Sequence, residues 1–429
     1  MGDYVGCDSY WYSGDGLMVG WKTVTIDEIT ELVTKGTTPT SVGYRFTNAG
    51  VNFVKIESIT KNGFFLLNKF AHIDVDCHES LKRSQLKSGD ILFSIAGALG
   101  RTAQVSPEIL PANTNQALAI IRLQPSTEVM PEFVMRALSS GILIEQIEKQ
   151  RGGVAQQNLS LTQVKNFQIP LPPLAEQKRI VAILDEAFAG IDAAVANTEN
   201  NLANARELFE SYLDGVFTQK GDGWVKKSVS ELAEHCLGKM LDKKKNKGTF
   251  KPYLRNLNVR WFDFNLGDVL EMKFEEIEED RYSARKGDVL ICEGGYPGRA
   301  AIWPHEETIY FQKALHRVRF KEVLHSQWFL FYLYLSDKNG NLRQYFTGAG
   351  IQHFTGQSLK RFVLPIAPNA AMENQLEKFE YLHAETQRLE AIYQQKLESL
   401  AELKQSILQK AFAGELTTLP VKIREETAV

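Results

Sequence analysis

The sequence predicts an α+β protein with two globular domains in tandem repeat, each followed by a long helix. Short segments recur in the same order in both halves of the 429-residue chain. Each half holds short β-branched and aromatic runs between turn residues, a pattern typical of strands. Each half also ends in a long stretch whose apolar residues recur every three or four positions, which is typical of an amphipathic helix.

The repeat consists of four pairs of matching segments. The pairs are Gly20-Trp21 with Gly223-Trp224, 87–92 with 285–290, 115–118 with 312–315, and 167–170 with 362–365. The separation is 203 residues from Trp21 to Trp224, 198 from Gly89 to Gly287 and 195 from Phe167 to Phe362. Two units of nearly equal length therefore fill the chain, and such a duplication suits an elongated target with approximate two-fold repetition.

Strands dominate the predicted core of each globular half. In the first half, Val51–Ile56, Asp90–Ile95 and Ala117–Leu123 are expected as strands, and Pro131–Leu138 as a helix. Prolines precede both long helices, and because proline cannot donate within a helix, each helix should begin at an extended, stiff joint.

The two long stretches predict helices over 174–218 and 369–416. The apolar stripe of the first begins at Ile180, and that of the second runs from Phe379 to Ile407 through Lys396 and Leu403. Such spacing over several heptads favours a coiled-coil seam between the two helices. Polar residues interrupt the stripes, and they either fix the register or mark local breaks with solvated side chains: Thr198, Asn200, Asn201 and Lys396.

These elements divide the chain into six parts. They are an N-terminal extension 1–19, a first domain 20–173, a first spacer helix 174–218, a second domain 219–368, a second spacer helix 369–416 and a C-terminal tail 417–429.

Composition excludes several classes of function. The four cysteines are far apart, which favours reduced thiols in a cytoplasmic protein. No segment approaches the ~20 apolar residues that span a bilayer, so no membrane partner is expected. Phosphate-binding, zinc-protease and paired-cysteine motifs are missing from the sequence. We therefore expect no catalytic residues, no metal site and no cofactor bound by this chain.

Two glycine-rich loops recur at equivalent places and are candidates for DNA contact. They are 95–101 and 293–299, and both end in Gly-Arg. Glycines let a backbone approach a phosphate or base edge closely, with Arg101, Tyr296 and Arg299 in reach of nucleic acid. The alternative is a tight turn with a solvated arginine, because glycine is the ordinary turn residue.

A second pair of loops carries amide side chains. The candidates are Arg151, Gln156, Gln157 and Asn158 in the first half, and Gln352 and His353 in the second. Asparagine and glutamine can bond an adenine edge through two hydrogen bonds. Gln157 and Gln352 can equally cap the following helix or tie the loop to the domain.

Charge is nearly balanced overall, with 49 Lys and Arg against 52 Asp and Glu, but it is unevenly distributed. A basic stretch over 239–260 precedes an acidic run over 268–280, which we expect to point away from DNA. The basic candidates for phosphate contact are Lys239, Lys243, Lys244, Lys245, Arg255 and Lys313, with Lys35 and Arg45 in the lighter counterpart of the first half. A solvated loop is the alternative explanation of the lysine run.

These features together resemble the specificity subunit of type I restriction-modification enzymes. The resemblance runs from Gly20 to about Leu416, and its most specific marks are Ile169–Gln177, read as IPLPPLAEQ, and Leu403–Leu416, read as LKQSILQKAFAGEL. The second copy departs from the first at Ala367 and Asn374, where the first has Pro172 and Glu176. The extension 1–19 has no counterpart.

The resemblance implies two target-recognition domains that each read one half of a split, asymmetric site in double-stranded DNA. It implies that the helices form an antiparallel coiled coil, which spaces the half-sites and docks methyltransferase subunits. Those partners would carry S-adenosylmethionine and methylate adenine, while separate restriction subunits would use ATP and Mg. Two other hypotheses compete: a fused methyltransferase or nuclease without recognisable motifs, and a coiled-coil scaffold that binds only proteins.

Overall fold

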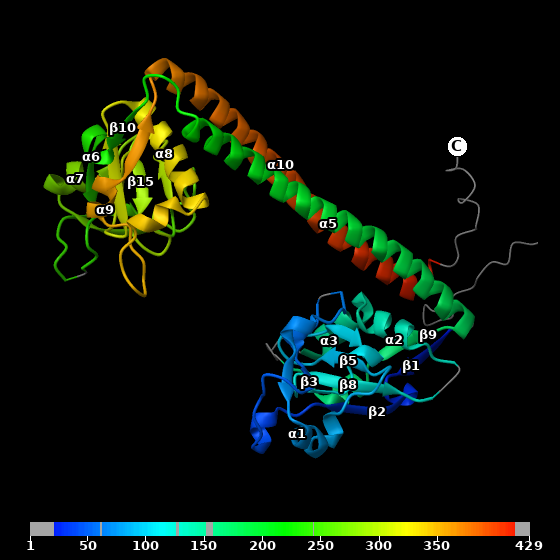
Figure 1. The fold of residues 1–429 in the computed structure, drawn as a ribbon. Coiled ribbons are helices and arrows are strands. Elements are labelled where there is room, and N and C mark those ends of the chain that lie inside the picture. The colour runs from blue at the N-terminus through cyan, green and yellow to red at the C-terminus, as the bar shows by residue number, and fades with distance from the viewer. Residues whose placement is uncertain (1–20, 61, 126–127, 152–157, 243, 417–429) are drawn as a thin grey trace, which may run out of the picture. The chain divides into compact units, whose positions relative to one another are not determined.

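The structure is a computed structural model that describes residues 21–60, 62–125, 128–151, 158–242 and 244–416 (Figure 1). The chain divides into two compact units. Unit 1 comprises residues up to Asn197 together with those from Lys396 onward, and unit 2 comprises Thr198–Gln395.

Unit 1 is built on a four-stranded antiparallel sheet with the order β2-β8-β5-β6. A three-stranded sheet, β4-β3-β7, packs beside it, and strands β1 and β9 form a separate antiparallel pair. The strands are β1 (Lys22–Thr25), β2 (Thr30–Lys35), β3 (Val51–Val54), β4 (Ala71–Ile73), β5 (Ile91–Ser94), β6 (Thr102–Gln104), β7 (Ala112–Thr114), β8 (Leu118–Leu123) and β9 (Gln168–Leu171). The short helices are α1 (Val75–Ser80), α2 (Pro131–Leu138), α3 (Gly141–Arg151) and α4 (Leu161–Lys165).

Unit 2 repeats this plan. Its main sheet has the order β11-β18-β15-β16, its second sheet β13-β12-β17-β14, and β10 pairs with β19. The strands are β10 (Val225–Ser228), β11 (Ala233–Leu237), β12 (Thr249–Leu254), β13 (Leu270–Phe274), β14 (Ser283–Ala284), β15 (Val289–Cys292), β16 (Ala300–Ile302), β17 (Ile309–Phe311), β18 (Leu315–Phe320) and β19 (Val363–Ile366). The short helices are α6 (Val229–Leu232), α7 (Glu279–Tyr282), α8 (Val323–Lys338) and α9 (Gly356–Arg361).

The predicted α+β class and tandem repeat are therefore confirmed at the level of strand order. The two main sheets have the same connectivity, and each unit's second sheet contains one parallel pair, β3 with β7 and β12 with β17. The units differ locally, because β14 extends the second small sheet and one helix, α8, stands where unit 1 has α2 and α3.

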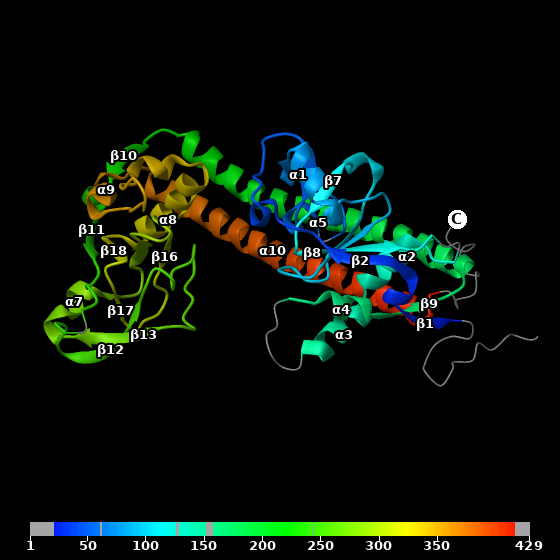
Figure 2. The same ribbon diagram turned by 90° about the horizontal axis from the view of Figure 1, so that it is seen from below.

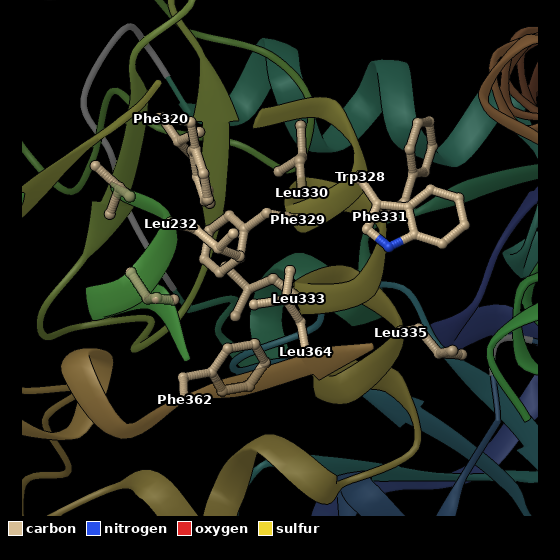
Figure 3. Packing of buried hydrophobic residues seen from close by; sticks show 14 of the residues in the cluster. Leu232, Phe320, Trp328, Phe329, Leu330, Phe331, Leu333, Leu335, Phe362 and Leu364 are labelled. Carbon is tan, nitrogen blue, oxygen red and sulfur yellow. The ribbon is translucent and has the colours of Figure 1, made fainter. Parts of the chain in front are cut away.

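The central strands are buried on both faces, which explains their continuous apolar runs. In β5, Ile91 and Phe93 belong to the cluster that includes α2, whereas Leu92 packs toward the smaller sheet. In unit 2, α8 supplies an aromatic cluster around Trp328 (Figure 3). The Trp328 indole Nε1 donates a hydrogen bond of 2.7 Å to the Pro365 carbonyl, so the helix is fixed to β19.

The long helices α5 (Leu174–Thr218) and α10 (Asn369–Phe412) pack together within each unit and run side by side in both views (Figures 1 and 2). Their cross-contacts pair Asp192 with Lys404 in unit 1, and Arg206 with Glu390 and Tyr212 with Gln375 in unit 2. As the residue numbers on α5 rise, the residue numbers of their contact partners on α10 fall, so the helices are antiparallel.

The predicted seam is wrong at several positions. Lys396 and Leu403 are exposed, whereas Leu397 and Lys404 are partly buried, because the contacting face drifts away from a strict heptad. Of the polar residues in the first helix, Thr198 is buried in the seam, while Asn200 and Asn201 face solvent.

The repeated Gly-Asp turn has a structural role in both units. Gly89 and Gly287 adopt φ values of 86° and 88°, the left-handed region that favours glycine. The next residue, Asp90 or Asp288, is buried and accepts two hydrogen bonds of 2.7–2.8 Å from an arginine on the neighbouring strand. The arginines are Arg122 on β8 and Arg319 on β18.

A buried glutamine fixes the start of α5. The Gln177 side chain donates hydrogen bonds of 2.8 Å to the carbonyls of Glu128 and Pro172, and it accepts one of 2.9 Å from the Met130 amide. This residue of the IPLPPLAEQ segment therefore ties the helix to the chain that precedes α2.

In the described ranges, no helix is long and apolar enough to cross a bilayer.

Candidate nucleic-acid interface

In unit 1, loops that are distant in sequence meet at one end of the main sheet. The Gly36 amide, after β2, donates to the Leu118 carbonyl, and the Ile95 amide, after β5, donates to Ala117 at 2.9 Å. The Leu159 amide donates to the Ile95 carbonyl at 2.8 Å, and Ala96 forms a β-bridge with Asn158. We name this region the loop edge of unit 1: residues 35–38, 95–98, 115–117 and 158.

Unit 2 has the same arrangement. The Gly238 amide donates to the Leu315 carbonyl, and the Glu293 amide donates to Ala314 at 2.8 Å. The Phe354 amide donates to the Glu293 carbonyl at 2.7 Å, and Gly294 forms a β-bridge with His353. The loop edge of unit 2 comprises residues 238–239, 293–296, 312–314 and 352–353. In both units, therefore, the glycine-rich loop and the described end of the amide-bearing loop are neighbours.

Several predicted site residues lie at these loop edges with exposed side chains. They are Lys35 and Asn158 in unit 1, and Tyr296, Lys313 and Gln352 in unit 2. Tyr296 is 67% exposed, which leaves it accessible for stacking. His353 is partly buried, and its Nδ1 lies 3.3 Å from the Glu293 carboxylate. This geometry suits hydrogen bonding and stacking with nucleic acid.

Arg101 and Arg299 make contacts inside their own domains. The Arg101 guanidinium donates to the Ile59 carbonyl at 3.0 Å, and that of Arg299 donates to the Asn256 carbonyl at 2.9 Å. Arg299 also lies 4.4 Å from the centroid of the Tyr296 ring. Each arginine thus holds the loop that follows β3 or β12 against the glycine-rich loop.

Lys239 and Arg255 are paired with the acidic run. Lys239 is 7% exposed, its ammonium pairs with Glu278, and it donates to the Lys273 carbonyl at 3.1 Å. Burial raises the pKa of Glu278. The hydrogen bonds that its carboxylate accepts from Lys239 and from the Glu275 amide have the larger combined effect, so this pKa is below its ordinary value. Arg255 donates to the Asp268 carboxylate at 2.6 Å. The antiparallel pairing of β12 with β13 brings the two charge runs together.

The remaining candidates fall into two groups. Arg45, Lys244 and Lys245 are exposed on loops outside the defined loop edges. Arg151 is the last residue of α3, and its side chain lies outside the described residues, as do Gln156, Gln157 and Lys243.

Sequence reasoning missed three polar residues of these surfaces. Thr38 donates to the Gln116 side chain at the first loop edge, and Glu293 faces His353 at the second. Gln116 lies in the recurring segment 115–118 and Glu293 lies in the second glycine-rich loop, so position within the repeat is the signal that could have found both. Within the described ranges, no group of three or more His, Cys, Asp and Glu could hold a metal ion.

Comparisons with known proteins agree on one family. The model of the type I restriction modification DNA specificity domain matches residues 18–203 and again 221–402. The chain is 22% identical over 432 residues to the specificity subunit of type I restriction enzyme EcoKI from Escherichia coli (strain K12), covering 94% of this chain and 91% of that protein. It is 31% identical to the EcoBI specificity subunit of Escherichia coli over 169 residues, which are 39% of this chain and 35% of that protein.

Solved structures share the fold. A chain from a study of complex assembly and conformational transition of the type I R-M system superimposes with a TM-score of 0.75 at 20% identity, covering 93% of this chain and 99% of the other. The HsdS subunit of Thermoanaerobacter tengcongensis gives a TM-score of 0.53 at 19% identity, with 93% and 98% covered.

Two copies of a recognition domain, each followed by one of two long antiparallel helices, define a class of DNA-specificity proteins. The chain belongs to the type I restriction-modification DNA specificity family. It is a specificity subunit, the non-catalytic component of such an enzyme.

Proposed function

We propose that each globular domain reads one half of a bipartite, asymmetric site in double-stranded DNA through its loop edge. The observation that carries this proposal is the duplication of the loop edge, with exposed polar side chains on the same sheet end of both units. The domains correspond to residues 20–173 and 219–368; α5 lies between them in sequence, and α10 follows the second.

The two loop edges differ in chemistry, which supports an asymmetric site. Lys35, Gln116 and Asn158 line the first, whereas Tyr296 and Lys313 with the His353–Glu293 pair line the second. Amides suit an adenine edge, lysine suits guanine or phosphate, and a carboxylate accepts from the cytosine amino group. Exposed Arg45, Lys244 and Lys245 would supply phosphate contacts. Lys239, Arg255 and both glycine-loop arginines serve the framework instead.

The helix pair separates the half-sites and docks methyltransferase subunits in the complete complex. Two helices of these lengths offer a long polar surface beyond their shared seam, which suits protein partners. In this scheme S-adenosylmethionine belongs to the methyltransferase subunits, and ATP and Mg belong to the restriction subunits. The assembly acts on DNA in the cytoplasm, where the free thiols of Cys77, Cys236 and Cys292 would stay reduced.

Exchange of one domain tests this function. Residues 21–168 would be replaced by those of a related subunit, and the modified DNA motif would be determined with the partner methyltransferase present. Only one half of the motif should change, and the other half and the gap should stay the same. A change in both halves, or in neither, would refute separate reading by each domain.

A further inference from the structure

Each unit contains a hairpin that reaches from the recognition domain to the long helices. The hairpin of unit 1, residues 59–65, is closed by a bridge between Ile59 and Phe65, and residue 61 within it lies outside the described residues. The hairpin of unit 2, residues 259–264, is closed by a bridge between Val259 and Phe264. We call them fingers.

The tips of the two fingers are structurally equivalent. Gly63 has φ 82°, and a Cβ placed on it would lie 2.9 Å from the carbonyl oxygen of Thr102, the first residue of β6. Phe262 has φ 65°, and its amide donates to the carbonyl of Ala300, the first residue of β16. Phe262 is the one non-glycine residue with positive φ among the described residues. A bulky side chain in this conformation is strained, so other contacts must hold it there.

Aromatic contacts with α8 and α10 hold Phe262 in this conformation. The Phe262 ring lies 4.2 Å from the His383 ring on α10, and 5.1 Å and 5.0 Å from Phe331 and Tyr334 on α8, measured between centroids. His383 lies in turn 5.5 Å from Phe209 on α5. The tip of the second finger is therefore an aromatic wedge against α8 and α10, and His383 connects it to α5.

The first finger makes the equivalent contact with polar groups. Asn62 donates to the Asp192 carboxylate on α5 at 3.4 Å and accepts from the Lys404 ammonium on α10 at 3.1 Å. Lys404 also pairs with Asp192 at 2.9 Å. Because Asn62 is exposed, these polar contacts should be weaker than the aromatic contacts of Phe262.

The fingers also connect to the loop edges. Arg101, at the end of the first glycine-rich loop, donates to the carbonyl of Ile59 at the base of its finger. Arg299 donates to the carbonyl of Asn256, which lies just before the second finger. In each unit, a continuous path of contacts therefore runs from the glycine-rich loop through the finger to the long helices.

We infer that the fingers are positioning elements: each holds the loop edge at a fixed orientation on the helix pair of its own unit, and so limits the gap length between half-sites that the protein accepts. This inference rests on the proposed bipartite function. The fingers would not touch bases themselves. Loosening one should therefore change the tolerance for gap length and leave the bases that are read unchanged.

The test uses the full chain reconstituted with its methyltransferase subunits. The initial methylation rate is measured on duplexes with the preferred gap and with one base pair more or fewer, and the ratio of rates defines gap discrimination. Phe262→Gly removes the wedge and also suits the left-handed backbone, so the chain should still fold. Loss of the aromatic contacts should reduce gap discrimination by about tenfold. Asn62→Ala should reduce it by about twofold or less, because exposed polar contacts are weak.

Two variants serve as controls. Phe262→Tyr keeps the ring and should keep gap discrimination, and Ile277→Ala changes a 91% exposed apolar residue outside the finger and should change nothing. Unchanged discrimination in Phe262→Gly would overturn the inference, and so would an equal loss of rate on every duplex, since that is what general destabilisation produces. If the wild-type complex shows no gap preference at all, the proposed bipartite function itself fails.

Discussion

Replacing Asp288 by asparagine should destabilise unit 2 by about 3 kcal/mol. The carboxylate is 2% exposed and accepts hydrogen bonds of 2.8 and 2.7 Å from Arg319. It also accepts a hydrogen bond of 2.9 Å from the Arg285 amide. Removing one partner of a buried ion pair costs ~3–5 kcal/mol, because the other charge is left uncompensated. The lower end of this energy range applies here, because the Arg319 side chain is 16% exposed and a second carboxylate, that of Asp280, lies 3.6 Å from it.

Urea unfolding followed by tryptophan fluorescence measures this loss of stability, and the signal comes mainly from unit 2. Four of the six tryptophans, at 224, 261, 303 and 328, lie in unit 2. With an unfolding slope of about 2.5 kcal/mol per molar urea, the midpoint should fall by roughly 1 M. Adding Arg319→Met to Asp288→Asn should cost less than the sum of the two single changes.

A matched surface pair supplies the control. Lys286 and Glu306 are 58% and 79% exposed, so Glu306→Gln should cost less than about 1 kcal/mol. If Asp288→Asn costs no more than Glu306→Gln, the carboxylate does not hold the turn to β18, and the structural reason given for the repeated Gly-Asp segment is wrong.

Three further outcomes are expected. Burial, reinforced by the neighbouring His235, lowers the pKa of His316 from about 6.5 to about 4. Between these pH values the unfolded chain binds more protons than the folded chain. The free energy of unfolding should therefore fall by about 3 kcal/mol from pH 7 to pH 4. His316→Leu should remove most of this fall in urea titrations, whereas His305→Gln, at an exposed site, should leave it. Burial raises the pKa of Cys292 to about 11, so the folded protein should resist thiol reagents at pH 8 at this position until denatured, as peptide mapping would show. In salt titrations of DNA binding by the complex, Lys313→Gln should reduce the log–log slope by about one, and Lys239→Gln should leave it unchanged while lowering the melting temperature.

Periodicity predicted the long helices because it is a local property of a sequence, and comparison of the two halves singled out the short segments that repeat. The helix stripes and the Gly-Asp turn could be recognised from residues a few positions apart. The arginine partners of the turn could not, since Arg122 and Arg319 lie 32 and 31 residues after Asp90 and Asp288 and meet them only through strand pairing. The same holds for the fingers, whose contacts join residues as distant as Asn62 and Lys404.

The candidate site shows the limit of reasoning from charge. The stretch 239–260 is basic as a sequence, but Lys239 and Arg255 pair with Glu278 and Asp268, which flank the paired strand β13. Conversely, Lys313 stands out little in the sequence, yet its side chain is exposed on the second loop edge, where its backbone amide donates to the Lys239 carbonyl at 2.9 Å. Exposure depends on strand register, which the charge pattern alone does not determine.

Mapping methylated adenines in DNA modified by the complete complex tests the central claim most directly. The account predicts one motif with two different specified blocks separated by a gap of fixed length and unspecified sequence, with one methylated adenine in each block. A contiguous motif, or a motif with two identical inverted halves, would contradict separate reading by two unlike domains.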